Sequence, residues 1–347
     1  MKKNIIKTAV VGCGRVSRTA HYNAIEKNDE LKLLAVCDVD KERADHWAAE
    51  NHVKAYYCIE DLLENESLDL ISINTPNGTH SELGIKAANK SINIIVEKPL
   101  DMTIKAGDAL IKACADNNVN LFVILQNRYN KTNKLLKSCI EKGRFGKLVT
   151  CNVTVNWRRG MNYYTEDNGW RSKTALAGGV FTNQCIHYLD MMLWLIDSFP
   201  VSVFAKMGSV FPIEVEDHGV GIVKFKNDVI GSFVLTNHAY PDDMEGSITI
   251  SGEKGMVKLG GKSMNKVVWW EFEDEQIEDS QIKEAESNPP TVYGFGHIEF
   301  YNRVTDFLLY GKNENMIING KEGRRSLELM EGFYLSNKSG KEIKLPL

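Results

Sequence analysis

Two glycines near the amino terminus, with one aspartate farther along, have the types and spacing of a dinucleotide-binding loop. Segment 12–17 reads GCGRVS and lies between an apolar stretch and a helical pattern. Gly12 would permit a tight turn, and Gly14 would let the backbone approach a pyrophosphate that the following helix terminus attracts. Ser17, at the third glycine position, is small enough for helix–strand packing. Asp38 ends the next apolar stretch and would accept hydrogen bonds from an adenine ribose. Because Val-Asp follows it, and not Arg or Lys, the sequence favours NAD over NADP.

Two further polar segments follow predicted strands, where parallel sheets bind ligands. Segment 75–80, TPNGTH, follows strand 69–74, and segment 97–99, EKP, follows strand 92–96. Lys98, beside a positively charged nicotinamide, would have a lowered pKa and could exchange a proton with a substrate hydroxyl. The alternatives are a turn that needs Pro and Asn for backbone reasons, and a solvated surface lysine.

A histidine in a later helical pattern is the second candidate for proton transfer. Segment 178–190 combines an apolar side with Asn183, His187 and Asp190, whose spacing of four and three residues puts them on one helix face. A polar stripe beside an apolar side indicates a pocket wall. His187 could exchange a proton or hydrogen-bond a reacting hydroxyl, and the alternative is a structural histidine. No segment has metal-ligand spacing, so no metal is expected.

The elements that position these residues alternate between strand and helix up to about residue 125. Apolar stretches predict six buried strands with helical patterns between them. The sequence therefore predicts a doubly wound parallel sheet of the Rossmann type in an NAD-binding domain of residues 1–126. The predicted strands are 7–11, 33–37, 56–57, 69–74, 92–96 and 121–125, and the predicted helices include 41–50, 59–64 and 104–117.

After residue 126 the pattern changes to period-2 stretches, which predict a second α/β domain, 127–347, with a large open mixed or antiparallel sheet. Acidic segment 273–290 ends in Pro-Pro and is expected to be an exposed loop. The last long helix, 297–310, is expected to pack back on one of the domains. An open sheet face favours a homo-oligomer, a dimer or a tetramer. The predicted strands are 149–157, 201–210, 218–225, 229–236, 247–251 and 266–272, and helix 131–142 precedes them.

The composition argues against several classes of function. The 347 residues have a formal net charge of −4 and no basic tract, so neither nucleic acid nor a membrane is an expected partner. The seven cysteines lack a CxxC pair and are expected to be reduced thiols. Neither a signal peptide nor an apolar run of membrane-spanning length is visible, so a cytoplasmic location is expected.

The chain resembles the Gfo/Idh/MocA oxidoreductases over nearly its whole length. The resemblance rests on GCGRVS, TPNGTH, EKP, the helix with His187 and the GEKG turn at 252–255. It implies a Rossmann domain plus an open-faced α/β domain, catalytic roles for Lys98 and His187, and a turn at Pro99, often through a cis bond. Asn183 stands where many members have Asp, which argues against a simple Asp–His relay. The residues expected to bind NAD are Gly12, Gly14, Arg15, Val16, Asp38, Thr75, Pro76, Asn77, His80, Glu97, Lys98 and Gln126.

Segments 126–130 (QNRYN) and 157–164 (WRRGMNYY) make the chain similar to dehydrogenases that oxidise C3 of the sugar in UDP-N-acetyl-glucosaminuronic acid, for bacterial surface polysaccharides. Guanidinium groups suit a diphosphate and a carboxylate, and Tyr and Trp suit sugar and uracil rings; surface ion pairing is the alternative for each arginine. Arg159 is a weaker candidate for an anion contact than Arg158, because side chains alternate along a strand and Arg159 would point away from its neighbour. The substrate-binding candidates are Lys98, Arg128, Tyr129, Arg158, Tyr163, Tyr164, Trp170, Arg171, Asn183, Gln184 and His187.

The expected activity is therefore NAD-dependent oxidation of a secondary hydroxyl of this nucleotide sugar. Some relatives keep their cofactor, which makes 2-oxoglutarate a candidate hydride acceptor. One alternative is a dehydrogenase of a free cyclitol or aldose, as for inositol dehydrogenase. A distant alternative is a non-catalytic NAD-binding sensor, against which the presence of both Lys98 and His187 argues. The sequence leaves open the oxidised carbon, the release of NAD in each cycle, the oligomer size, and which of the two residues is the base.

Overall fold

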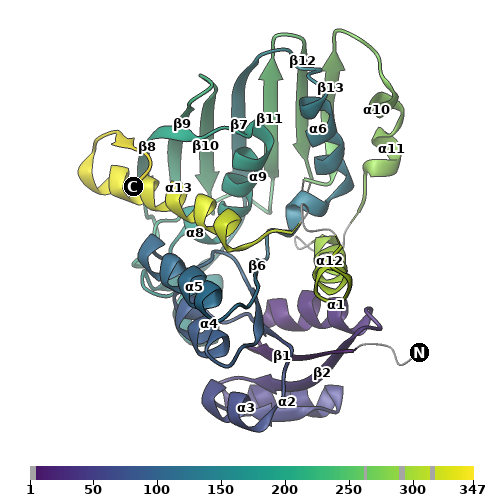
Figure 1. Ribbon diagram of the computed structural model, residues 1–347. Helices are drawn as coiled ribbons and strands as arrows, with labels where there is room; N and C mark the ends of the chain where they lie inside the picture. The colour runs from purple at the N-terminus through teal and green to yellow at the C-terminus, as the bar shows by residue number, and fades with distance from the viewer. Residues whose placement is uncertain (1–4, 262–263, 289–293, 313–316) are drawn as a thin grey trace. The chain divides into compact units, whose positions relative to one another are not determined.

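A computed structural model describes residues 5–261, 264–288, 294–312 and 317–347 (Figure 1). The chain forms two compact units. The first comprises residues 1–126 and 297–324, and the second comprises residues 127–296 and 325–347. The chain thus returns to its first unit after passing through most of the second.

The first unit contains a six-stranded parallel sheet in the order β3-β2-β1-β4-β5-β6, which confirms the predicted doubly wound sheet. The central strands are buried on both faces, as their continuous apolar sequences require. The strands are β1 (Ile6–Val11), β2 (Leu31–Cys37), β3 (Lys54–Tyr56), β4 (Leu70–Ile73), β5 (Asn93–Val96) and β6 (Leu121–Val123).

Helices connect these strands, and side-chain caps fix where two of them begin. The Asp40 carboxylate accepts from the Arg43 amide at 3.2 Å, and the Thr103 hydroxyl accepts from the Ala106 amide at the same distance. Helices α4 and α5 lie side by side in Figure 1. The helical elements are η1 (Ser17–His21), α1 (Tyr22–Glu26), α2 (Lys41–Asn51), α3 (Ile59–Asn65), η2 (Asn77–Thr79), α4 (His80–Ala88) and α5 (Ile104–Asp116).

Helix α12 (Gly296–Tyr310) packs on the first unit, where the Asn28 amide donates to Asn302 Oδ1 at 2.9 Å. It is not the last long helix, because α13 (Gly320–Ser339) follows and is longer. The first turn of α13 reads Gly-Lys-Glu-Gly, which has poor helix propensity and hid the helix from sequence analysis. Gly320 and Gly323 are required for packing, since a Cβ there would come within 2.7 Å of Leu121 and 2.8 Å of Val123.

The second unit contains an eight-stranded sheet in the order β13-β12-β11-β7-β10-β9-β8-β14, as predicted for a mixed or antiparallel sheet. Only the pair β10–β7 is parallel among its described strands. Strand β12, at 255–260, was missed because glycines bracket it. The strands are β7 (Leu148–Asn156), β8 (Pro200–Gly208), β9 (His218–Phe225), β10 (Ile230–Thr236), β11 (Glu245–Gly252), β12 (Gly255–Gly260), β13 (Lys266–Phe272) and β14 (Ile343–Lys344).

One face of this sheet is covered by helices, with α6 (Lys131–Glu141) and α9 (Ile186–Ile196) in front of it in Figure 1. The opposite face presents apolar side chains to solvent. Val220 lies opposite Val234 on neighbouring strands, and Ile222 lies opposite Ser232. Val220, Ile222, Ile230 and Val234 are each between 46% and 51% exposed. We call these four residues the open-face strip.

The acidic segment 273–290 was predicted to be an exposed loop, and for residues 277–285 that prediction is wrong. Two short helices form there, α10 (Ile277–Ser280) and α11 (Ile282–Ala285). Glu278 is buried, and Asp279 accepts two hydrogen bonds from Arg144 at 2.8 and 3.0 Å. Ion pairing with basic side chains from elsewhere neutralises the acids and lets the segment pack. Residues 289–290 of the predicted loop lie outside the described residues.

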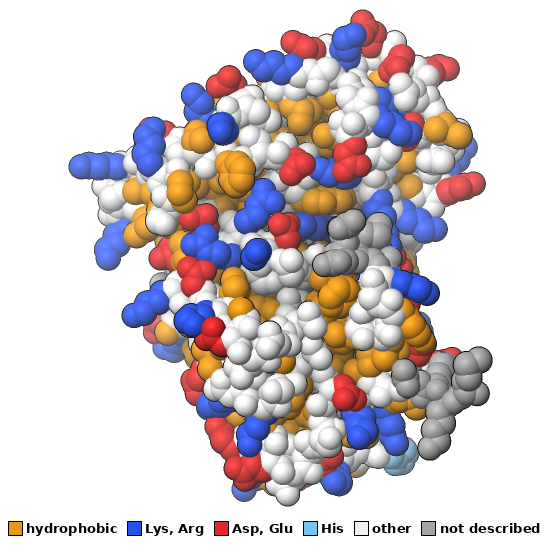
Figure 2. Space-filling view, viewed as in Figure 1, with side chains coloured by type: hydrophobic (Ala, Val, Ile, Leu, Met, Phe, Trp, Pro, Cys, Tyr) orange, Lys and Arg blue, Asp and Glu red, His pale blue; other side chains and the backbone are white. Residues whose placement is uncertain are grey.

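No helix in the described ranges is long and apolar enough to cross a membrane. On the face shown in Figure 2, Lys and Arg side chains are interspersed with Asp and Glu side chains. This mixture accords with the small net charge and shows no single-sign field on that face.

Replacing Arg144 by Met should destabilise the protein by roughly 3 kcal/mol, because it removes a fully buried guanidinium and leaves the half-buried Asp279 without this partner. The guanidinium also lies 4.0 Å from the Phe272 ring centroid and donates to the Asp274 carbonyl. The check is the free energy of unfolding in urea. Lys173→Met, which removes an exposed ion pair with Glu214, is the control and should leave the midpoint unchanged. Equal effects of the two variants would contradict the packing role of Arg144.

Candidate active site

The glycine loop after β1 has the backbone conformation that a dinucleotide site needs. Gly12 has φ +91°, and a Cβ there would come within 2.7 Å of the Asn74 carbonyl oxygen. A Cβ at Gly14 would meet no heavy atom within 4 Å, which leaves open space beside this backbone. Ser17 is fully buried and donates to the Gly12 carbonyl at 2.5 Å, so its hydroxyl ties the helix to the loop.

The Asp38 carboxylate is held beside this loop by two backbone amides. Its Oδ2 accepts from Cys13 N–H at 2.7 Å, and its Oδ1 accepts from Asp40 N–H at 2.9 Å. A carboxylate has about four lone-pair sites, so both oxygens can still accept hydrogen bonds from ribose hydroxyls. Arg15 is exposed and Val16 half-buried on the same loop. The arrangement fits the adenosine and pyrophosphate parts of NAD.

Two buried amides lie at the ends of β4 and β6 with an atom that has no hydrogen-bond partner among the described residues. These atoms are Asn74 Nδ2 and Gln126 Oε1. Asn74 is 7% exposed and Gln126 is 2% exposed. An orphaned buried donor and acceptor at the edge where parallel sheets bind ligands fit a polar ligand such as a carboxamide. The sequence predicts Asn74 at a strand end, but no motif there marks it as a site residue.

His80 connects the two polar turns at this edge. Its Nδ1 lies 2.8 Å from the Pro99 carbonyl oxygen, and its Nε2 lies 2.9 Å from that of Thr75. The ring is fully buried, and burial lowers its pKa. Because both nitrogens face backbone carbonyls, His80 positions the turns rather than presenting its ring to a cofactor. Of the neighbouring candidates, Thr75 and Pro76 are half-buried and Asn77 is buried.

Lys98 is half-buried at the end of β5, and its bond to Pro99 is cis. Burial lowers the pKa of the Lys98 amine, and the neighbouring Glu97 carboxylate opposes that shift. Glu97 is itself buried and accepts from the Lys98 backbone amide at 3.0 Å, so its carboxylate faces the protein interior. Glu97 is thus held by internal contacts, and its predicted contact with the cofactor stays a prediction. Of these two neighbouring residues, Lys98 is the one whose side chain, an amine, can accept a proton from a substrate.

In the second unit, five side chains form an alternating stack of aromatic rings and guanidinium groups. The Arg159 guanidinium lies 5.1 Å from the Trp157 ring centroid and 5.8 Å from that of Tyr163. The Arg171 guanidinium lies 5.1 Å from the Tyr163 centroid and 4.7 Å from that of Trp170. We call this set the Arg–aromatic stack. It gathers two positive charges and three rings in the segment predicted to bind a nucleotide sugar.

The stack is fixed by polar contacts at its edges. Arg159 donates to Asp243 at 2.9 Å and Arg171 donates to Asp167 at 2.9 Å, while both arginine side chains keep 15–17% exposure. Gln184 Nε2 donates to the Tyr163 hydroxyl at 2.9 Å. Each guanidinium has five N–H donors, so one carboxylate does not exhaust it. The stack can therefore present donors to an anionic ligand.

Arg159 belongs to the Arg–aromatic stack and Arg158 does not. The sequence favours Arg158 over Arg159 as a substrate contact. Strand β7 ends at residue 156, so strand alternation does not decide where residues 158 and 159 point. Arg158 instead donates to the Ala239 carbonyl at 3.2 Å and lies over the exposed Tyr240 ring.

Three predicted substrate contacts are buried in the protein. Arg128 is paired with Asp190 on α9, with Nε–Oδ2 at 2.9 Å and Nη2–Oδ1 at 2.5 Å. Tyr164 is 2% exposed and its hydroxyl accepts from the Asn237 amide at 2.8 Å. Tyr129 is buried with a lysine above its ring. These side chains are held by contacts within the second unit, and their predicted contacts with a substrate stay predictions.

The predicted single helix face of Asn183, His187 and Asp190 is wrong for Asn183, which lies in a different helix from the other two residues. Helix α8 (Val180–Asn183) ends at Asn183, and α9 begins at Ile186. The chain turns between them, with the Cys185 amide donating to the Val180 carbonyl at 2.9 Å. Within α9, Asp190 pairs with Arg128 in the interior, and His187 is half-buried, as Asn183 is at the end of α8.

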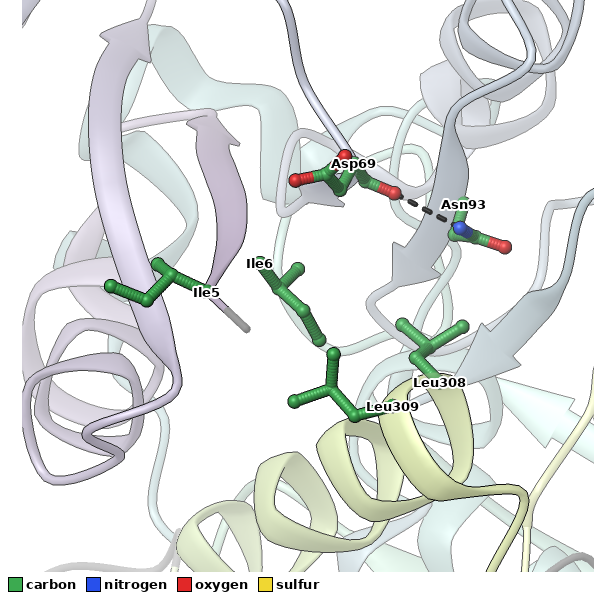
Figure 3. Close-up of a pocket in the computed structure, with 6 residues that line it drawn as sticks. All are labelled: Ile5, Ile6, Asp69, Asn93, Leu308 and Leu309. Atoms are coloured by element: carbon green, nitrogen blue, oxygen red, sulfur yellow. Dashed lines mark hydrogen bonds between the residues drawn. The ribbon is translucent and has the colours of Figure 1, made fainter. Parts of the chain in front are cut away.

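An open hollow lies at the opposite edge of the first unit's sheet (Figure 3). It is lined by the start of β1 at Ile5 and Ile6, the strand starts at Asp69 and Asn93, and Leu308 and Leu309 of α12. In Figure 3 the Asn93 amide donates to the Asp69 carbonyl, a bond of 3.0 Å. Because these are the amino ends of the strands, the hollow is distinct from the glycine-loop edge.

Comparison with known families matches both parts of the chain. Residues 6–125 match the oxidoreductase family with an NAD-binding Rossmann fold, and residues 134–258 match the GFO/IDH/MocA C-terminal domain. Among curated proteins, the myo-inositol 2-dehydrogenase of Thermotoga maritima is 26% identical over 73% of this chain and 74% of its own length. The glucose-6-phosphate 3-dehydrogenase of Bacillus subtilis is 21% identical over 94% of this chain and 95% of its own length.

Two solved structures are similar over the full chain. The WlbA dehydrogenase of Bordetella pertussis, in complex with NADH and UDP-GlcNAcA, has a TM-score of 0.95 and 36% identity over 100% of this chain and 99% of its own. The WlbA dehydrogenase of Chromobacterium violaceum, with the same two ligands, has a TM-score of 0.93 and 35% identity over 100% and 98%.

Replacing Asp38 by Ala should weaken NADH binding roughly tenfold to a hundredfold, because hydrogen bonds to a charged group contribute about 1.5–3 kcal/mol. Calorimetric titration of NADH is the check. Asp45→Ala, on the neighbouring helix and bonded to Tyr57, is the matched control and should bind NADH normally. Unchanged affinity in the Asp38 variant would remove this carboxylate from the cofactor site.

Proposed function

Because the chain belongs to the Gfo/Idh/MocA family of NAD-binding oxidoreductases, we propose that it oxidises C3 of the sugar in UDP-N-acetyl-glucosaminuronic acid. The observation that carries the proposal is the 36% identity over the whole chain to a dehydrogenase crystallised with NADH and UDP-GlcNAcA. In this proposal residues 1–126 form the NAD-binding domain and residues 127–347 supply the contacts to the substrate.

The cofactor is held by the edge of the parallel sheet. The glycine loop would face the pyrophosphate, Asp38 would accept from the ribose, and the orphaned amide atoms of Asn74 and Gln126 would bind the nicotinamide carboxamide. When bound, NAD supplies the hydride acceptor. The protein's own contribution is to orient the sugar and to remove the hydroxyl proton.

Lys98 is the base in this proposal. The Lys98 amine takes the proton of the sugar hydroxyl, and its lowered pKa makes the neutral form available closer to neutral pH. His187 hydrogen-bonds the reacting hydroxyl and does not relay a proton to residue 183, because Asn183 carries no carboxylate. In this proposal Lys98 accepts the proton and His187 orients the hydroxyl, because position 183 lacks the carboxylate that a histidine relay would need.

The Arg–aromatic stack supports a substrate with anionic groups. Arg159 and Arg171 can each bind a phosphate or a carboxylate with the donors that their aspartate partners leave, and the rings give flat apolar surfaces for a sugar or a uracil. Gln184, bonded to the Tyr163 hydroxyl, supports the same surface. A neutral cyclitol could accept hydrogen bonds from the two guanidinium groups but carries no charge to pair with them.

A free cyclitol or aldose is the second candidate substrate, because curated relatives include inositol dehydrogenases of Thermotoga maritima and Rhizobium meliloti. The test is nicotinamide turnover with UDP-N-acetyl-glucosaminuronic acid, myo-inositol and glucose, each with and without 2-oxoglutarate. Including 2-oxoglutarate detects an enzyme that retains its cofactor and needs a second substrate to reoxidise it. Activity confined to myo-inositol or glucose would overturn the nucleotide-sugar proposal. NAD binding without turnover on any substrate would favour a sensor.

We also propose a homo-oligomer in the cytoplasm. The open-face strip is an apolar surface that a second copy of the sheet could cover. The seven cysteines are free thiols in the described structure, which accords with a reducing compartment. Light scattering tests the oligomer: a dimeric or tetrameric mass is expected, and a monomeric mass at micromolar concentration would reject the proposal.

Replacing Lys98 by Met should lower kcat by at least a hundredfold, because a positioned general base contributes about 10²–10⁴-fold. The affinity for NADH should change little, since the lysine's main role is proton transfer. Steady-state kinetics and calorimetry provide the check. The wild-type kcat should also fall as pH is lowered through the Lys98 pKa, since only the neutral amine is a base. A variant with near-normal turnover would exclude Lys98 as the base.

Replacing Arg171 by Met should raise KM for the nucleotide sugar roughly tenfold or more, because a charge-assisted hydrogen bond contributes about 1.5–3 kcal/mol. Arg158→Met, a neighbouring arginine outside the stack, is the matched control and should change KM less. The check is KM measured at saturating NAD. Equal KM values for the two variants would exclude a specific anion contact at the stack.

A further inference from the structure

A buried polar cluster lies directly beside Lys98 in the first unit. Glu97, His21 and His297 place one ligand-type atom each within 4.8 Å of one another. Their side chains are 9%, 0% and 4% exposed. We call these three residues the Glu97 cluster. The proposed reaction assigns no role to its two histidines.

Each oxygen of the Glu97 carboxylate faces a different partner. Oε1 lies 2.9 Å from His21 Nε2 and 3.5 Å from His297 Nε2. Oε2 accepts from the backbone amide of Lys98 at 3.0 Å. The carboxylate therefore connects two imidazole rings to the backbone of the residue that carries the catalytic amine.

The environment of His21 assigns its tautomer. Its Nδ1 lies 2.8 Å from the Tyr301 hydroxyl and 3.2 Å from the Ser72 hydroxyl. These two hydroxyls lie 2.8 Å apart. With the proton on Nε2, neutral His21 donates to Glu97 and accepts at Nδ1 from a hydroxyl. Burial lowers the pKa of His21, although Glu97 opposes the shift, and this favours the neutral ring.

Two elements that are distant in the sequence meet at this carboxylate. His21 ends η1, a π-helical turn directly after the glycine loop, and such turns frequently occur at functional sites. His297 and Tyr301 come from α12, which joins the unit only after the chain has returned from the second unit. A buried carboxylate without donors would cost several kcal/mol, so these contacts hold Glu97 in one place.

We propose that Glu97 is a positioning residue, which His21 and His297 hold in place so that its carboxylate fixes the turn and the charge around the Lys98 amine. The proposal rests on the proposed role of Lys98 as the base. It also explains the return of α12 to the first unit, because that helix supplies His297 and the hydroxyl that orients His21.

The charge of Glu97 has a measurable consequence for Lys98. Burial alone would raise the Glu97 pKa, but hydrogen bonds from His21 and His297 hold it well below the usual range, so the carboxylate is ionised. Other titratable groups that interact with it are Lys98, His80 and Tyr301. An anion beside an amine favours the ammonium form, so removing the charge should lower the Lys98 pKa further.

The test compares Glu97→Gln with Glu82→Gln, an exposed glutamate on α4 whose loss removes only surface pairing. The rate at which acetic anhydride modifies Lys98, followed by peptide mass spectrometry across a pH series, reports the Lys98 pKa without any substrate. We expect its midpoint to move to lower pH in Glu97→Gln only. We also expect kcat to fall roughly tenfold to a hundredfold, as misplacement of a catalytic group does, with NADH affinity unchanged.

The labelling experiment tests the positioning role of Glu97 independently of the identity of the substrate. A shifted midpoint in a protein that is inactive on the nucleotide sugar would support the role of Glu97 and reject the substrate. An unshifted midpoint with unchanged kcat in folded Glu97→Gln would overturn the role of Glu97.

His297 provides a second route if Glu97→Gln does not fold. His297→Ala should lower kcat, and His297→Gln, which keeps an N–H donor, should restore part of it. His46→Ala, an exposed histidine on α2, is the control. Equal kcat for His297→Ala and wild type would contradict the proposal.

Two imidazoles and a carboxylate are also a metal-ligand set, so one equivalent of zinc in purified wild-type protein would overturn the hydrogen-bonded assignment.

Discussion

The cofactor side of the site depends on one geometric constraint, which is that the strands of a parallel sheet all end at the same edge. Segments far apart in the sequence, at residues 12, 38, 74, 97 and 126, follow five different strands of one sheet and therefore meet. The loop after each strand is free to carry polar groups, because the sheet itself is held by buried apolar side chains. The chemistry is thus placed by a scaffold that takes no part in it.

The same edge shows how the protein stabilises a buried carboxylate, Glu97, beside the proposed base, Lys98. As the proposed base, Lys98 needs a lowered pKa, which burial supplies. It also needs a fixed position, and we infer that the neighbouring carboxylate supplies it at the cost of a buried anion. Imidazole donors offset that cost without adding a permanent charge. In the second unit, the pair Arg128–Asp190 buries two charges that neutralise each other, whereas Arg159 and Arg171 stay partly exposed. Exposure separates the arginines suited to a ligand from those that support the fold.

Residues 5–126 of the first unit could be predicted almost completely from the sequence, because their strands are continuous apolar runs and their motifs follow strand ends. The glycine loop, Asp38 and the EKP turn are local patterns whose positions the fold then fixes. The second unit was harder. Strand β12 lies between glycines, and α13 begins with a turn of low helix propensity. Neither has the periodicity that sequence analysis uses.

The errors at the site came from contacts between residues that are distant in the sequence. Arg128 and Asp190 are 62 residues apart, and no local pattern shows that they pair. Arg159 was judged by strand alternation past the point where the strand ends. His297 is 200 residues from Glu97 in the chain, so its part in the cluster required the packing of α12 to be known. Local spacing finds candidates, and tertiary packing decides which of them face a ligand.

The most direct measurement follows the hydrogen that leaves the sugar. UDP-N-acetyl-glucosaminuronic acid carrying deuterium at C3 is incubated with the enzyme, NAD and 2-oxoglutarate, and the reduced nicotinamide and the reduced keto acid are analysed by mass spectrometry. Oxidation at C3 by direct hydride transfer predicts deuterium in one of these two products and none in solvent. Turnover in which the deuterium remains on the sugar would contradict the account, because another carbon would then be oxidised.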